Sequence, residues 1–162
     1  MKSRHVIVTG ASRGLGEAVV RKLSKEGWSV SFGARSLAPL MALKDELSNP
    51  SVHLFAEALD VTDSASVESF FNHASEFSGI PDAVVHCAGV YGPFGPTHLV
   101  DPEIWMSALD VNLRGTLLVL QNSIKVMLQG GRGRIVALSG GGRQIRCPIS
   151  RRTLHQRPLW CV

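Results

Sequence analysis

The chain has 162 residues, 44% of them apolar and 19% charged, with a net charge of +4. This length fits a single domain that buries roughly 70% of the surface of its unfolded chain, and the composition is that of a globular protein. No apolar run reaches the roughly 18 residues of a membrane span and the amino end lacks a signal-peptide core, so we expect a cytoplasmic protein with no membrane partner.

Apolar strands alternate along the chain with amphipathic helical stretches. The predicted strands are His5–Thr9, Trp28–Ala34, Val52–Ala58, Ala83–His86 and Arg134–Leu138. The predicted helices are Leu15–Glu26 ending near Gly27, Leu37–Leu47, Ser64–Phe77 with a cap near Asp63, and one long helix from Pro102 to about Gln129. This alternation predicts an α/β fold, a Rossmann-type doubly wound parallel sheet of about five strands with helices on both faces.

A glycine-rich turn joins the first strand to the first helix, with the spacing Gly-x-x-x-Gly-x-Gly. Glycines allow a tight turn and the close approach of a ligand, and the backbone N–H groups at a helix start attract a pyrophosphate. The pattern therefore predicts dinucleotide binding, although an ordinary strand-to-helix turn is the alternative. The predicted cofactor-binding residues of this turn are Thr9, Gly10, Ser12, Arg13, Gly14, Leu15 and Gly16.

The end of the second strand bears on the choice of cofactor. Sites for NAD place an acidic residue there, which bonds the ribose hydroxyls and repels a 2′-phosphate. This chain has Arg35 instead, and Arg13 in the glycine turn can reach the same phosphate. The sequence therefore favours NADP(H) over NAD(H), unless both arginines are plain surface charge.

The glycine spacing resembles that of the short-chain dehydrogenase/reductase family, and the resemblance covers residues 5 to about 142. It implies that Asp60 and Val61, after the third strand, contact the adenine of the cofactor, with a helix-capping turn as the alternative. The sequence His86-Cys87-Ala88-Gly89 stands where the family has Asn-Asn-Ala-Gly. The resemblance therefore assigns Cys87, Ala88 and Gly89 to the cofactor, while His86 and Cys87 depart from the family pattern.

The resemblance also implies catalytic residues. Asn112 matches the family's helical asparagine that helps hold a proton-relay water, with a solvated helix asparagine as the alternative. Ser139 is the candidate for the serine that polarises the substrate oxygen, although Gly140 could occupy that position. The implied function is an NADP(H)-dependent oxidoreductase acting on the hydroxyl or carbonyl group of a small-molecule substrate.

The tyrosine and lysine that the family uses for proton transfer are not found where expected. A lysine four residues after the tyrosine lowers the pKa of the phenol, and the pair is expected near residues 152–157. The chain has a single tyrosine, Tyr91, and no lysine follows Lys125. The alternative function is therefore a catalytically inactive dinucleotide-binding remnant.

The last residues differ in character from the rest of the chain. All 13 acidic residues lie at or before Asp110, and nine basic residues follow it. We expect an NAD(P)-binding domain over residues 1–142 and a basic, irregular, disordered tail over 143–162. Such a tail could attract nucleic acid, but no nucleic-acid-binding motif accompanies it, so that partner is not favoured. The three cysteines have no metal-ligand spacing, and no metal site is expected.

The tail is also where the family's missing pair should lie. We hypothesise that residues 143–162 are an out-of-frame reading, because permitted codons shifted by two bases yield Tyr-Ala-Ala-Ser-Lys at the expected distance. The chain would then be a family domain truncated after the fifth strand. Family members form homo-oligomers partly through the long helix, so we expect an incomplete interface and exposed apolar surface here.

Overall fold

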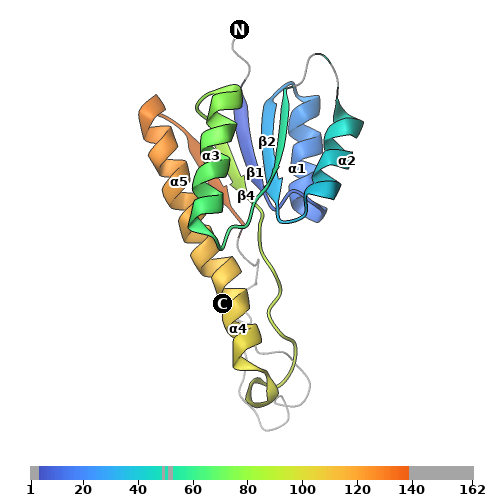
Figure 1. Cartoon of the computed structure of the whole chain (residues 1–162), viewed down its shortest axis with the longest axis vertical. Coiled ribbons are helices and arrows are strands. Elements are labelled where there is room, and N and C mark those ends of the chain that lie inside the picture. The colour runs from blue at the N-terminus through green and yellow to red at the C-terminus, as the bar shows by residue number, and fades with distance from the viewer. Residues whose placement is uncertain (1–3, 49, 51–52, 139–162) are drawn as a thin grey trace.

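A computed structural model describes residues 4–48, 50 and 53–138, and their arrangement is that of a Rossmann-type α/β fold (Figure 1). The strands are β1 (His5–Thr9), β2 (Ser29–Ala34), β3 (Leu54–Ala58), β4 (Ala83–His86) and β5 (Arg134–Ala137). The main helices are α1 (Gly14–Lys25), α2 (Leu37–Leu47), α3 (Ser64–Ser78), α4 (Pro102–Leu109) and α5 (Gly115–Gly130). All neighbouring strands are parallel, in the order β3-β2-β1-β4-β5, which confirms the predicted doubly wound parallel sheet.

The two faces of the sheet are covered by different helices. Successive side chains of a strand point to opposite faces, and β1 shows this directly. Val6 and Val8 belong to an apolar cluster with residues of α1 and α2, whereas Ile7 belongs to one with residues of α3 and α5. All three side chains are fully buried. The central strand therefore anchors both halves of the core, and its carboxyl end is held in a fixed place.

The predicted boundaries are confirmed for β1, β4 and α2, and elsewhere the observed ends differ by at most two residues. Gly27, with φ +77°, follows the end of α1, and the Asp63 carboxylate caps α3 by accepting from the Ala65 N–H at 3.0 Å. The predicted residues Val52 and Ser139 and the segment 143–162 lie outside the described residues.

The prediction of one regular helix from Pro102 to Gln129 is wrong in one respect. A π-helical turn, η2 (Asp110–Arg114), separates α4 from α5, while the chain continues helically on both sides of it. Gly115 follows this turn, and a Cβ there would lie 2.8 Å from Cγ2 of Val61. A single widened turn cannot be detected from the apolar periodicity of the sequence. Such π-helical turns are frequent at functional sites.

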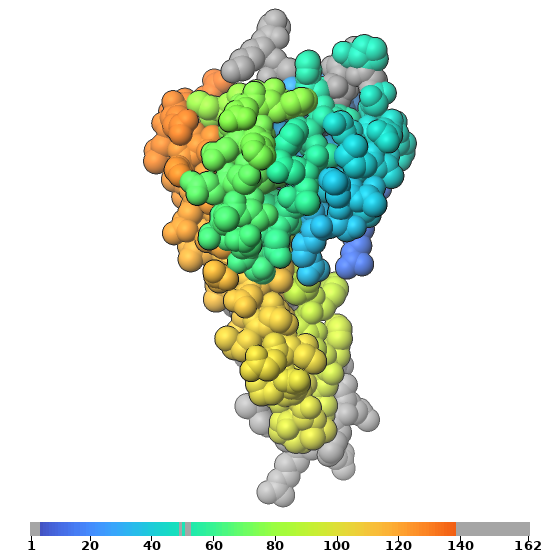
Figure 2. Space-filling model, viewed as in Figure 1, coloured from blue at the N-terminus to red at the C-terminus, as the bar shows by residue number. Residues whose placement is uncertain are grey.

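The lower part of the molecule is formed by α4 and the loop before it. Figures 1 and 2 show both extending beyond the carboxyl edge of the sheet as a narrow projection. A short 3-10 helix, η1 (Thr97–Leu99), lies in that loop. Several large apolar side chains of this part, of η2 and of α5 are exposed, among them Leu99, Leu113, Leu117 and Leu128. Within the described residues, no helix has both the length and the apolar character needed to cross a membrane.

Candidate functional site

The glycine turn lies at the carboxyl end of β1 and is too crowded for a side chain at two of its glycines, Gly10 and Gly16. Gly10 has φ +69°, and a Cβ on it would lie 2.5 Å from the backbone nitrogen of Ala88. A Cβ on Gly16 would lie 2.3 Å from the carbonyl oxygen of Gly10. The end of β1, the loop after β4 and the start of α1 therefore touch through their backbones. This close approach is the role expected of glycine at both positions.

The amino end of α1 offers its backbone donors to a ligand. Arg13 is the N-cap residue, and its side chain makes no capping hydrogen bond to the helix. Helix starts leave N–H groups without helical partners and carry a partial positive charge. Ser12 is half-buried and Leu15 is exposed, so the turn stays accessible from outside. This end of a 12-residue helix is suited to an anion such as a pyrophosphate.

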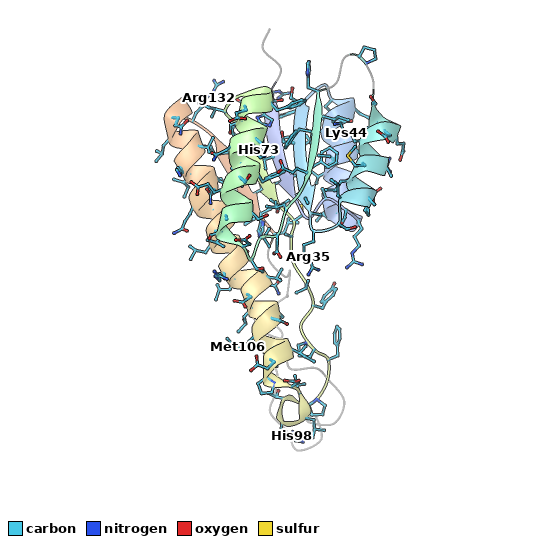
Figure 3. All side chains as sticks on the ribbon, viewed as in Figure 1. Arg35, Lys44, His73, His98, Met106 and Arg132 are labelled. Carbon is cyan, nitrogen blue, oxygen red and sulfur yellow. The ribbon has the colours of Figure 1, made fainter. Side chains whose placement is uncertain are left out.

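The two arginines proposed for the 2′-phosphate are exposed. Arg13 belongs to the glycine turn, and Arg35 directly follows β2 at the carboxyl edge of the sheet (Figure 3). In the part of the chain that the structure describes, neither guanidinium has an ion-pair partner within 4.0 Å. Both side chains are therefore free to face a phosphate.

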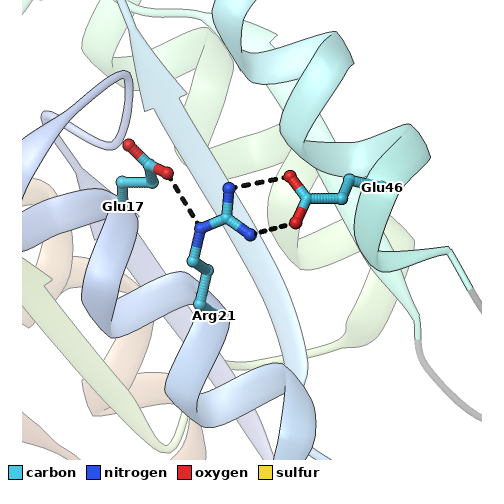
Figure 4. A network of polar contacts seen from close by, with 3 residues as sticks. All are labelled: Glu17, Arg21 and Glu46. Carbon is cyan, nitrogen blue, oxygen red and sulfur yellow. Dashed lines mark hydrogen bonds and ion pairs between the residues drawn. The ribbon is translucent and has the colours of Figure 1, made fainter.

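Arg21, further along α1, is by contrast fully engaged. Its Nε lies 2.8 Å from Oε1 of Glu17, and its two terminal nitrogens face both carboxylate oxygens of Glu46 (Figure 4). These hydrogen bonds raise the pKa of Arg21 and lower that of Glu46. The network connects α1 to α2.

Asp60 lies beyond β3 in a tight turn of its own. Its Oδ1 accepts from the backbone N–H of Thr62 at 2.9 Å and from the Thr62 hydroxyl at 2.7 Å. These bonds, followed by the charge of Arg35, lower the pKa of Asp60, so the carboxylate stays ionised. Asp63 is the residue that caps α3, while Asp60 lies in the turn that leads to it, so the structural alternative stays open beside the cofactor role. Val61 is buried in the core beside Gly115 and can offer a ligand only its backbone.

The loop after β4 is tied to the end of β1. Cys87 donates its backbone N–H to the carbonyl of Thr9 at 3.2 Å, and the N–H of Ala88 lies 3.4 Å from the Thr9 hydroxyl. Burial raises the pKa of the Cys87 thiol, so it stays protonated at neutral pH. Gly89 is exposed, and a Cβ there would lie 3.3 Å from Oδ1 of Asn112.

Asn112 lies in the η2 turn, and its side chain is bound to the loop after β4. Its Oδ1 accepts from the N–H of Val90 at 2.9 Å, and its Nδ2 donates to the Val90 carbonyl at 2.8 Å. Asn112 is exposed, as the alternative of a solvated helix asparagine expects, but its amide is bound to the loop. The structure brings Asn112 beside the predicted cofactor loop, whereas Ser139 falls outside the described residues.

Two side chains of this region were not singled out from the sequence. His86 is 1% exposed, and its Nδ1 and Nε2 lie 2.7 Å from Oγ1 of Thr9 and 3.0 Å from Oγ1 of Thr116. The sequence showed His86 only as a departure from the family pattern, and it gave no sign of Thr116. A polar residue ending an otherwise apolar strand is the one available signal of such a contact.

Acid should weaken the fold through His86. Burial lowers the pKa of this imidazole in the folded protein, whereas in the unfolded chain the pKa of a histidine is about 6.5. The unfolded state therefore binds more protons below that value, so the stabilising contribution is complete above it and is lost as the pH falls. We expect the free energy of unfolding, measured by urea denaturation from pH 7.5 to pH 5, to fall more steeply for the wild type than for His86→Asn. Equal slopes would contradict this assignment.

Comparisons with known proteins agree with this architecture. A family model described as short chain dehydrogenase matches residues 4–147. The chain is 37% identical over 139 residues to an NADPH-dependent pterin aldehyde reductase from Arabidopsis thaliana, covering 86% of this chain and 57% of that protein. It is 38% identical over 146 residues to a glycine betaine reductase from Emericella nidulans, covering 90% of this chain and 11% of that protein.

A solved structure shares the same arrangement. The alcohol dehydrogenase from the archaeon Thermococcus sibiricus, complexed with 5-hydroxy-NADP, superposes with a TM-score of 0.77 at 33% identity. The match covers 83% of this chain and 57% of that one. The chain thus spans less than two thirds of the length of each of these relatives.

Proposed function

The chain belongs to the short-chain dehydrogenase family, and on this premise we propose that it binds NADP(H) across the carboxyl edge of its sheet. The observation that carries the proposal is the glycine turn, whose backbones approach too closely for any side chain at Gly10 or Gly16. The uncapped start of α1 opens on the same turn. Together they suit the pyrophosphate of a dinucleotide.

The adenosine half of the cofactor would lie on the β2 and β3 side of the turn. Arg35 and Arg13 would bind the 2′-phosphate, and the absence of an acid beside Arg35 at the end of β2 avoids repulsion. Asp60 would accept a hydrogen bond from the adenine amino group, since its carboxylate stays ionised. The preference for NADPH is supported by the name of the Arabidopsis relative and by the NADP analogue in the archaeal structure.

The nicotinamide half would lie on the β4 and β5 side. The resemblance assigns Cys87, Ala88 and Gly89 to this half, and the Asn112 side chain holds the adjoining loop in place. The cofactor supplies the hydride when bound. We propose that the protein acts as an oxidoreductase on the hydroxyl or carbonyl group of a small molecule, with Asn112 and Ser139 as its catalytic residues.

A second candidate is dinucleotide binding without turnover. It is favoured by the printed sequence, in which Tyr91 is the single tyrosine and no lysine follows Lys125. A phenol needs a nearby cation to act as an acid or base near neutral pH. Tyr91 is 90% exposed, with the ring of Phe94 6.0 Å away, and it lies in the loop before α4.

Cofactor titration combined with a turnover assay distinguishes the oxidoreductase from the inactive dinucleotide-binding protein. We expect the purified 162-residue chain to bind NADPH more tightly than NADH by about 10-fold or more, with both dissociation constants measured by calorimetry. Oxidation of NADPH above background across a panel of aldehydes and ketones is the result expected of the oxidoreductase, and cofactor binding without turnover would select the second candidate. A folded chain that ignores both cofactors at millimolar concentration would overturn the proposed binding.

A further inference from the structure

His86 is the buried centre of a chain of hydrogen bonds with a fixed direction. The Asn112 carbonyl can only accept, so the Thr116 hydroxyl, 2.7 Å away, donates to it. The Thr116 oxygen must then accept from the Nε2–H of His86, which leaves Nδ1 to accept from the Thr9 hydroxyl. The Thr9 oxygen in turn faces the N–H of Ala88. Burial lowers the pKa of this imidazole, so the ring is neutral and carries its proton on Nε2.

This chain connects segments that are far apart in the sequence. Thr9 ends β1 beside the glycine turn, His86 ends β4, and Thr116 lies in the first turn of α5. Its two ends are the N–H of Ala88 and the carbonyl of Asn112. The Asn112 side chain also holds both backbone groups of Val90. Through these bonds the loop after β4 and the η2 turn are fixed relative to the glycine turn.

All of these contacts lie on one side of β1. The sheet order places β4 and β5 on that side, and β2 and β3 on the other. A dinucleotide whose pyrophosphate sits at the glycine turn must place its two halves on opposite sides. Arg35 and Asp60, which follow β2 and β3, suit the adenosine half. The half that faces the His86 chain is therefore the nicotinamide half.

We infer that His86 is a positioning residue for the nicotinamide half of the cofactor, an inference that rests on the NADP(H) binding proposed above. It holds the 87–90 loop and the Asn112 carbonyl in one arrangement without touching the cofactor. The hydrogen bond between the buried His86 ring and Thr9 is strengthened by its neighbours and by the low dielectric around it. Removing the ring would leave the hydroxyls of Thr9 and Thr116 without a shared partner. The 87–90 loop would keep its separate bonds to Thr9 and Asn112 but lose the link that holds these two residues relative to each other.

A comparison of two ligands tests this inference. His86→Leu removes both hydrogen bonds while keeping an apolar side chain in the core. We expect it to weaken NADPH binding about 10-fold or more, the effect of one or two lost buried hydrogen bonds. Binding of adenosine 2′,5′-bisphosphate, which carries only the adenosine half, should change by less than about 2-fold. A general loss of folded structure would weaken both ligands alike.

His5 supplies the matched control. It is also 1% exposed, its Nδ1 lies 2.7 Å from the Gly79 carbonyl, and its Nε2 lies 2.8 Å from Oγ of Ser31. It begins β1, so it lies at the opposite edge of the same sheet from the glycine turn. His5→Leu should lower the unfolding temperature as His86→Leu does, yet leave the ratio of the two dissociation constants unchanged.

A second variant covers the case in which His86→Leu does not fold. The Oδ1 of His86→Asn can replace Nδ1 toward Thr9, but this shorter side chain does not reach Thr116. We expect it to lose about 3-fold or more in NADPH affinity with the fragment unaffected. Equal effects on both ligands, or none on NADPH, would overturn the role of His86. A wild type that binds neither ligand would instead overturn the proposed cofactor site.

Discussion

Gly10→Ala should lower the free energy of unfolding by about 3 kcal/mol and abolish NADPH binding at millimolar concentration. The first cause is the backbone, because φ +69° costs a residue with a Cβ roughly 1–2 kcal/mol. The second is the 2.5 Å approach of that Cβ to the nitrogen of Ala88, a backbone atom that cannot rotate away. To relieve this clash, the glycine turn and the loop after β4 would have to move apart. These are the two backbone segments that would hold the cofactor.

Gly27→Ala is the control for this prediction. Gly27 has φ +77°, but a Cβ there would have open space around it within 4 Å. The strain of the positive φ is therefore present without the clash, and we expect a loss of only about 1–2 kcal/mol in urea denaturation. NADPH affinity should be unchanged, because Gly27 precedes β2 at the opposite end of the sheet from the turn. A Gly10 variant no worse than this control would contradict the close-contact argument.

Arg35→Glu should reverse the preference between the two cofactors. The guanidinium at the end of β2 has no ion-pair partner in the described part of the chain, so its hydrogen bonds to a 2′-phosphate would be gained in full. Hydrogen bonds to charged groups contribute about 1.5–3 kcal/mol each. The glutamate would add repulsion of the phosphate and an acceptor for the ribose hydroxyls of NAD. We expect the dissociation constant for NADPH to rise about 100-fold while that for NADH stays or falls.

Arg21→Ala tests whether a loss of positive charge alone explains such a change. This arginine is held by Glu17 and Glu46 between α1 and α2. Its removal lowers the net charge of the protein in the same direction but should leave the ratio of NADPH to NADH affinities unchanged. Calorimetric titration of both cofactors against the two variants makes the comparison. A similar shift in both would sink the assignment of Arg35 to the 2′-phosphate.

The short-range patterns of the chain were sufficient for the architecture. Short apolar runs such as β4, alternating with helical stretches, were enough to predict the parallel sheet. The periodicity of a strand or a helix is visible within a few neighbouring residues. The glycine turn could be placed for the same reason, since Gly10 and Gly16 lie six residues apart on either side of one strand-to-helix junction. Arg13 and Arg35 could be proposed as phosphate ligands in the same way, because each follows the end of a predicted strand within a few residues.

Contacts between distant residues were decided only by the tertiary structure. The His86 ring meets Thr9 across 77 positions of sequence and Thr116 across 30. The Asn112 amide meets Val90 across 22. Each contact depends on which strands become neighbours and on one π-helical turn, and no local periodicity encodes either. The residues that would bind the cofactor were therefore readable from the sequence, whereas those that hold the binding loop in place became visible only once β1, β4 and α5 lay side by side.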